Sequence, residues 1–278
     1  MKKLIRDGLP RAVSIAALLC ASLAFAQWPL HSAPGIPRMA DGEPDLDAPA
    51  PRTADGKPDL SGLWQGVNVF GGGQPAVPET TDGPPVAGFL DIAQNIEEGL
   101  PLRPEAEAVL KTRRDNSGKD NPEAHCLPMG IMQFHTQGAP RKIIQAPSVL
   151  VILYEASMGM RQIFTDGRSL PTADAQPWWY GYSVGRWEDD TLIVETTGLR
   201  DDGWLDVFGT PLTDAAKLTE RFRRVSYGRM EVDITIDDPK AYTRPWTVRV
   251  NQQIMPEQEL IEFVCLENQR FGTAGDSP

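Results

Sequence analysis

Cysteine, histidine and basic side chains are all scarce in this chain of 278 residues. Cysteine and histidine occur three times each, and 27 Lys and Arg stand against 38 Asp and Glu, which gives a net charge of −11 at pH 7. Nucleic acids and anionic membrane surfaces both need clustered Lys and Arg, so neither is expected as a partner. No segment reaches the roughly 18 apolar residues of a membrane helix, so no membrane span is predicted.

The three histidines, His31, His125 and His135, do not have the spacing of a metal site. There is no H-E-x-x-H motif and no Cys/His cluster, so we predict neither a metal site nor a cofactor. The sequence also has no G-x-S-x-G elbow, and its glycine run at 71–73 leads into Gln-Pro, which cannot open a phosphate-binding helix. Serine hydrolase and nucleotide chemistry are therefore disfavoured.

Residues 1–26 have the form of a signal peptide. Basic residues, beginning with Lys2, precede an apolar run at 13–25, and Ala24-Phe25-Ala26 matches the small-x-small pattern of a cleavage site. Cleavage there starts the mature chain near Gln27. We therefore expect a periplasmic or secreted protein.

Removal of the leader takes Cys20 away and leaves Cys126 and Cys265 in an oxidising compartment. A disulfide between these two cysteines is the natural prediction for an exported protein. The alternative is a pair of buried free thiols.

The remaining chain divides into a strap, residues 27–60, and a single mainly-β domain, residues 61–278. The strap is Pro-rich, and its segment 37–46 recurs as 51–60. Asp-Gly and x-Pro steps favour turns over helix, so we expect this strap to be extended. One helix is predicted near 103–114, with Pro104 in its first turn, acidic residues at its start and basic residues at its end.

Beyond residue 141 the hydrophobic pattern has a period of two, interrupted by regular turn signals. The candidate strands are 142–145, 149–155, 159–164, 178–187, 191–197, 218–225, 230–236, 247–254 and 259–265. Short sequential strands joined by tight turns predict an antiparallel meander that forms a lipocalin-like barrel or a sandwich.

The first hairpin in this meander has a two-residue loop at Asp189-Asp190. This loop places Trp187 opposite Leu192 and sets Arg186 diagonal to Glu195, within reach of an ion pair.

The second hairpin has two possible registers. A two-residue Tyr-Gly loop would put Arg221 and Arg223 on the apolar face, which is costly. A three-residue loop at 226–228, with Gly228 left-handed, instead pairs Arg223 with Glu231 and Arg221 with Asp233. We predict the second register, which leaves Glu220 on the apolar face opposite Ile234.

Several long motifs resemble a large family of exported bacterial proteins with no established activity. They are the segments 52–64 (RTADGKPDLSGLW), 126–128, 181–187 (GYSVGRW), 219–222, 235–242 (TIDDPKAY) and 262–265. Relatives often carry histidines in the segment that corresponds to 209–217, and this chain has none there. The resemblance implies membership and export but no reaction. Separately, Gly62-Leu63-Trp64 ahead of a meander looks like the opening of a lipocalin barrel.

Aromatic and small residues indicate a ligand site. Trp179, Ser183 and two glycines share one face of a predicted strand, which either accepts a close neighbour or leaves room for a ligand. The predicted ligand-binding residues are Trp179, Ser183, Trp204, Asp206 and Trp246.

Glu220 is the strongest candidate for chemistry, because no charged partner is predicted for it. A desolvated carboxylic acid would have a raised pKa and could act as an acid or a base, with Tyr182 or His135 as a partner. The alternative is that a buried arginine or a backbone N–H satisfies Glu220 structurally.

The function predicted from these features is that of an exported protein of lipocalin-like type that binds a small apolar or aromatic molecule. One alternative is a cofactor-free isomerase, lyase or hydrolase built on Glu220. Another is a structural or interaction module whose strap engages a partner. The sequence specifies neither the ligand nor the oligomeric state.

Overall fold

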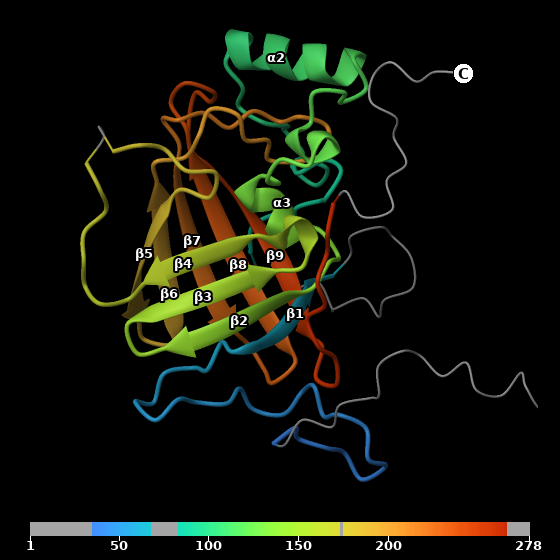
Figure 1. Ribbon diagram of the computed structural model, residues 1–278, viewed down its shortest axis with the longest axis vertical. Helices are drawn as coiled ribbons and strands as arrows, with labels where there is room; N and C mark the ends of the chain where they lie inside the picture. Colours follow the sequence, from blue (N-terminus) through green and yellow to red (C-terminus); the bar gives the residue numbers. More distant parts are fainter. Residues whose placement is uncertain (1–34, 68–82, 173–174, 266–278) are drawn as a thin grey trace, which may run out of the picture.

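The computed structural model describes residues 35–67, 83–172 and 175–265, and within them the chain is mainly β. Nine strands in sequential order close into a barrel, with two short helices, as Figure 1 shows. The closed barrel excludes the sandwich alternative. The strands are β1 (Gly62–Gly66), β2 (Arg141–Ala146), β3 (Val149–Tyr154), β4 (Met160–Phe164), β5 (Tyr182–Glu188), β6 (Thr191–Thr197), β7 (Lys217–Arg224), β8 (Arg229–Asp237) and β9 (Trp246–Ile254).

The expected antiparallel meander is wrong at one place, the contact between β4 and β5. These strands are parallel and pair only at Ile163–Ser183 and Phe164–Val184, whereas the other neighbours are antiparallel. Parallel pairing needs a long connection that returns the chain to the starting end. The chain between Phe164 and Tyr182 provides it, and the few paired residues leave a seam in the barrel wall.

The helix predicted near 103–114 is present as α2 (Pro104–Asp115) and lies outside the barrel in Figure 1. The short helix α3 (Ile131–Thr136) was not predicted, and all six of its residues are buried. The predicted strand 259–265 is absent. The reason is that β1 pairs with both β2 and β9, so the closed sheet has no free edge left for another strand.

Both predicted hairpin registers are confirmed. Trp187 lies opposite Leu192, and Arg186 and Glu195 form an ion pair at 3.3 Å. Arg223 lies opposite Glu231, and the two side chains are bonded.

Two details of the second hairpin differ from the prediction. Asp233 lies opposite Arg221 in the register but forms its ion pair with Arg249, at 2.6 Å. Gly228 is not left-handed. A Cβ atom at Gly228 would lie 2.5 Å from the Cβ of Leu46. Glycine is therefore required there by the close approach of the strap and not by a positive φ.

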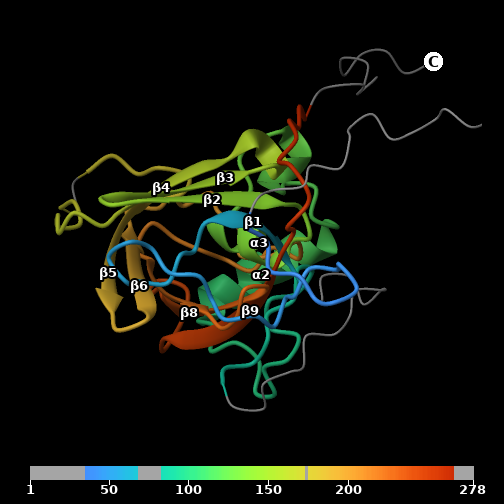
Figure 2. The same cartoon turned by 90° about the horizontal axis from the view of Figure 1, so that it is seen from below.

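The described part of the strap, residues 35–60, is not extended as predicted. Each copy of the repeat forms a compact turn closed by a β-bridge, Arg38–Pro44 in the first and Arg52–Pro58 in the second. In both copies the arginine donates to a glycine carbonyl, at 2.7 Å. Seen from below in Figure 2, the strap crosses the end of the barrel.

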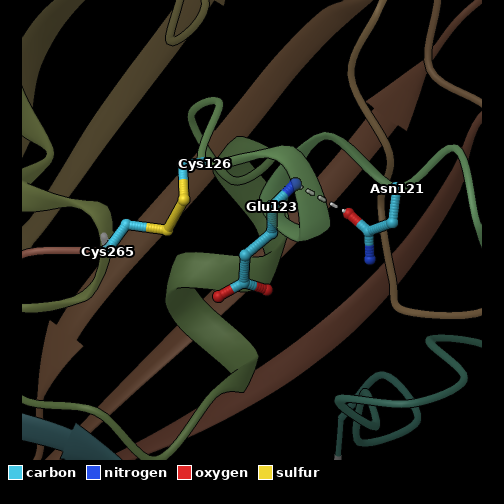
Figure 3. Close-up of a disulfide and its surroundings, with 4 residues drawn as sticks. All are labelled: Asn121, Glu123, Cys126 and Cys265. Atoms are coloured by element: carbon cyan, nitrogen blue, oxygen red, sulfur yellow. Dashed lines mark hydrogen bonds between the residues drawn. A yellow bond between two sulfur atoms is a disulfide. The ribbon is translucent and has the colours of Figure 1, made fainter. Parts of the chain in front are cut away.

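The predicted disulfide is present and joins Cys126 to Cys265, with the two Cα atoms 5.8 Å apart. Figure 3 shows it beside the short 3-10 helix Pro122–His125, in which the N–H group of Glu123 donates to the Asn121 side chain at 3.1 Å. The disulfide ties the segment after β9 to the loop before α3. Among the described residues no helix is long and apolar enough to cross a membrane.

Candidate functional site

Glu220 lies inside the barrel in a network of buried polar side chains. Arg161, on β4, donates to both carboxylate oxygens of Glu220, from Nη1 to Oε1 at 2.9 Å and from Nη2 to Oε2. The ring nitrogen Nε2 of His135, on α3, lies 2.9 Å from the same Oε1. The side chains of all three residues are at most 2 % exposed. The predicted pair Glu220 and His135 is therefore in contact, and a buried arginine satisfies the carboxylate.

Hydroxyl groups from two further strands hold Arg161 in place. Its Nε donates to Ser183 Oγ at 3.1 Å, and its Nη2 donates to Thr196 Oγ1 at 2.8 Å. Because β4, β5, β6 and β7 each contribute one member, the guanidinium group has one fixed orientation. The network also crosses the β4–β5 seam, where backbone pairing is weakest.

The charges in this network follow from its contacts. Burial by itself raises the pKa of Glu220, but the charge and hydrogen bonds of Arg161 and the hydrogen bond of His135 outweigh it and lower the pKa to about 2. Burial lowers the pKa of His135 in spite of the neighbouring carboxylate. At neutral pH Glu220 is therefore ionised and His135 is neutral. The raised pKa expected for an unpartnered Glu220 is not observed.

A second buried cation, Arg141, fixes helix α3 in the barrel. Its guanidinium donates to the backbone oxygens of His135 and Gln137, at 3.2 and 3.3 Å. Gln252 Nε2 also donates to the His135 oxygen, at 2.9 Å. Burial lowers the pKa of Arg141 to about 10, and the residue forms no ion pair within the described parts of the chain. The interior beneath α3 is thus a polar layer and not an apolar cavity.

A pocket of about 440 Å³ opens at the β4–β5 seam, and we call it the seam pocket. Its aromatic residues are Phe164, Trp178, Trp179, Tyr180 and Tyr182. Its polar residues are Arg161, Gln162, Gln176, Ser183 and Arg200, and no Asp or Glu is found among the described residues that line it. Arg161 and Ser183 are buried, so they form the floor of the pocket, whereas Trp178 is 54 % exposed and lies at its rim.

Aromatic and guanidinium groups stack around the seam pocket. The Tyr182 ring lies 5.3 Å from the Phe164 ring and 5.7 Å from the Trp178 ring, measured between centroids. The guanidinium carbon of Arg168 lies 3.8 Å from the Phe164 centroid, and that of Arg200 lies 4.5 Å from the Trp179 centroid. Through these contacts the aromatic rings and guanidinium groups of the wall pack against one another.

The structure brings some of the predicted site residues together and separates others. Trp179, Tyr182 and Ser183 line the seam pocket. Trp204 is almost fully buried and lines a second, adjoining pocket.

Asp206 and Trp246 lie in the core and line neither of these pockets. Asp206 accepts hydrogen bonds from the backbone of Ile92, at 3.0 Å, and from the hydroxyl group of Thr210, at 2.6 Å. The Trp246 ring packs on Tyr242, with centroids 5.3 Å apart.

Sequence reasoning missed Arg161 and Arg141, the two arginines that are at most 2 % exposed. A signal for both was available in the sequence, because side chains along a strand point alternately to its two faces. Arg161 shares its face with Ile163, and Arg141 shares its face with Ile143, so each arginine lies at a core position of an otherwise apolar face.

No protein family, curated protein or solved structure matches this chain at a significant level of similarity. The predicted resemblance to exported bacterial proteins therefore stays a prediction. Within the described residues, no group of three or more His, Cys, Asp or Glu side chains could hold a metal ion.

Proposed function

We propose that this protein is exported and binds a small aromatic molecule carrying an acidic group in the seam pocket. The observation that carries the proposal is the composition of the pocket. Among the residues that the structure describes, five aromatic residues and two arginines line it and no acidic residue does, although the chain as a whole is strongly acidic. Rigid aromatic walls with a few polar groups are what small-molecule sites use.

The acidic group of the ligand is inferred from the donors that remain available. Arg161 is neutralised by Glu220 behind the pocket floor. Arg200 pairs with Asp202 through Nε and Nη2, so its Nη1 group and the side-chain amides of Gln162 and Gln176 are the groups left to donate to a carboxylate. An anion in the seam pocket meets no like charge from the described residues of its lining, which favours an anion over a cation.

The fold supports a lipocalin-like role only in part. The sequential closed barrel matches that type, but the barrel interior is packed with buried side chains. We therefore propose the seam in the barrel wall, and not the barrel axis, as the binding position of the ligand.

The two alternative functions have less support. Neither Glu220 nor His135 lines the seam pocket, and Glu220 is held as a carboxylate by Arg161, which removes the proton that a general acid needs. The described strap residues donate and accept hydrogen bonds on the barrel end, for example from Gly228 N–H to the Leu46 oxygen at 2.8 Å. A docked strap is poorly placed to engage another protein.

Isothermal titration calorimetry with 4-hydroxybenzoate and its neutral analogue 4-hydroxybenzamide tests the proposal. We expect the acid to bind about tenfold more tightly than the amide, a difference of about 1.4 kcal/mol. Trp178→Ala, at the exposed rim, should weaken binding of the acid. Phe208→Ala is the matched control, because Phe208 is also exposed and lies outside the pocket.

Glu220→Gln separates binding from a catalytic role. If Glu220 is structural, this variant should be less stable and still bind 4-hydroxybenzoate. No binding of either probe by the wild-type protein would overturn the proposed function, and so would equal loss of binding in the Trp178 and Phe208 variants.

A further inference from the structure

A second pocket, of about 820 Å³, adjoins the seam pocket, and we call it the helix pocket. It lies between α2, the 3-10 helix before Cys126 and the chain after β6. Trp179 and Arg200 line both pockets. This stacked pair therefore forms part of the wall of both pockets, which makes the two pockets neighbours.

The helix pocket differs from the seam pocket in its charges. Asp120, Asp201 and Asp202 line it together with Arg113, Arg200 and His125. Arg200 is bonded to Asp202, at 2.6 Å.

The other charged groups of the helix pocket are not locked into ion pairs. Arg113 lies 4.6 Å from the centroid of Trp204 and donates to the Gly209 oxygen at 2.9 Å. Asp120 and Asp201 act on Arg113 only at longer range, and they form no ion pair within the described residues. The helix pocket thus presents strong donors and strong acceptors side by side.

Such a mixture suits hydroxyl groups better than ions. A hydroxyl group both donates and accepts, so it can satisfy an arginine and an aspartate that line the same space. An ion of either sign would satisfy one of them and be repelled by the other. Val109, Leu127 and Trp179 add apolar surface that can cover the carbon framework of a ring. The chemistry of the helix pocket is that of a saccharide site.

We propose that the two pockets form one site for an aromatic glycoside. The aromatic acid occupies the seam pocket, the sugar occupies the helix pocket, and the glycosidic link passes the Trp179–Arg200 pair. This inference rests on the proposed function, because it keeps the aromatic acid where that proposal puts it. To the proposed function it adds the chemical class of the complete ligand, an aromatic glycoside.

Three probes in calorimetry test the inference: 4-hydroxybenzoate, methyl β-D-glucoside and 4-carboxyphenyl β-D-glucoside. Joining two weak fragments that bind adjacent subsites raises affinity without new contacts. We therefore expect the carboxyphenyl glucoside to bind about tenfold or more tightly than either fragment.

A blocking variant locates the sugar. Val109 is 42 % exposed on α2 and lines the helix pocket, so Val109→Trp should fill the pocket without disturbing the core. It should reduce the affinity for the carboxyphenyl glucoside to that for 4-hydroxybenzoate, whose own binding should not change. Lys111→Trp, on the same helix but outside the pocket lining, is the matched control and should leave both affinities unchanged.

The outcomes separate the two proposals. Binding of 4-hydroxybenzoate with no gain for the glucoside would overturn the glycoside inference and leave the proposed function standing. The glycoside inference is also overturned if the glucoside binds more tightly but Val109→Trp has no effect, because the sugar then lies elsewhere. Failure of all three probes would overturn the proposed function and this inference together.

Discussion

The two ends of the barrel are closed by different means. At one end the buried helix α3 rests on a layer of buried charges, Arg161, Glu220 and Arg141. At the other end the turns of the strap rest on backbone hydrogen bonds, a close contact at Gly228 and exposed ion pairs such as Arg52–Asp190. The charges at the first end have no water to replace a lost partner. The ion pairs at the second end are exposed to water, and the exception there is Arg224, which is buried and donates to the oxygens of Asp59 and Tyr227.

This difference determines how much each contact matters. Removal of one member of a buried ion pair leaves an uncompensated charge in a medium that solvates it poorly. Removal of one member of an exposed pair costs little, because water and salt already screen the interaction. Single substitutions of the buried charged residues beneath α3 should therefore lower the free energy of unfolding strongly. At the strap end, the larger losses should come from substitutions that add side-chain volume where the strap packs closely.

Arg161→Met should have the largest effect on stability. It leaves the Glu220 carboxylate buried without its arginine, and we expect the free energy of unfolding in urea to fall by about 3–5 kcal/mol. The double variant Arg161→Met/Glu220→Gln also removes the unpaired carboxylate charge and should recover about 1–3 kcal/mol of that loss. A loss below about 1 kcal/mol in the single variant would contradict the comparison between the two ends.

Lowering the pH should destabilise the end of the barrel that carries α3, because Glu220 becomes protonated. The pKa of Glu220 is about 2 in the folded protein and about 4.3 in an unfolded chain. Because the folded-state pKa is the lower one, Glu220 stabilises the fold above pH ~4 and loses this contribution as pH falls toward 2. Urea denaturation of the wild type and of Glu220→Gln at a series of pH values measures this contribution of Glu220 to the free energy of unfolding. The wild type should lose more stability than the variant between pH ~4 and pH ~2. Parallel plots of the free energy of unfolding against pH would show that Glu220 is not the group responsible.

Gly228→Ala should have an intermediate effect and act at the strap end. The added Cβ would lie 2.5 Å from the Cβ of Leu46 and 2.9 Å from its backbone, so the strap must shift. Overpacking of this kind costs about 1–3 kcal/mol. Gly203→Ala is the control, because the atom nearest to its new Cβ is 3.5 Å away. Equal losses in the two variants would show that the close approach of Leu46 is unimportant.

Asp190→Asn should have the smallest effect. The side chains of Arg52 and Asp190 are 52 % and 58 % exposed, so water surrounds their ion pair. We expect no change in the urea midpoint beyond experimental error, at low salt and at about 1 M salt alike. A loss comparable with that of Gly228→Ala would mean that the ion pair, and not the shape of the strap, holds this end closed.

Local patterns in the sequence predicted much of the β structure. The register of the β7–β8 hairpin followed from opposite charges, because Arg223 and Glu231 are near in sequence and only one register pairs them. The disulfide followed from cysteine number and expected compartment. The parallel β4–β5 contact could not be predicted in this way, because its partners are brought together by barrel closure and not by a tight turn.

The candidate site was predicted only in fragments. Trp179, Tyr182 and Ser183 were identified because they are close together in sequence, and the structure places them in one pocket. The partner of Glu220 was missed because Arg161 lies on another strand, across the barrel interior. The role of Arg200 was missed because it depends on stacking against Trp179, which a sequence pattern does not show.

The sequence by itself determined the two hairpin registers and most of the strands after residue 141, and its Asp-Gly and x-Pro steps favoured turns in the strap, since all of these depend on residues within a few positions of one another. The repeat shows the limit of this local information. Its two copies form the same turn, yet Arg38 pairs with Glu257 and Arg52 pairs with Asp190. Tertiary structure alone decided these long-range ion pairs, the buried network and the pockets, because closing the barrel places distant residues within bonding distance.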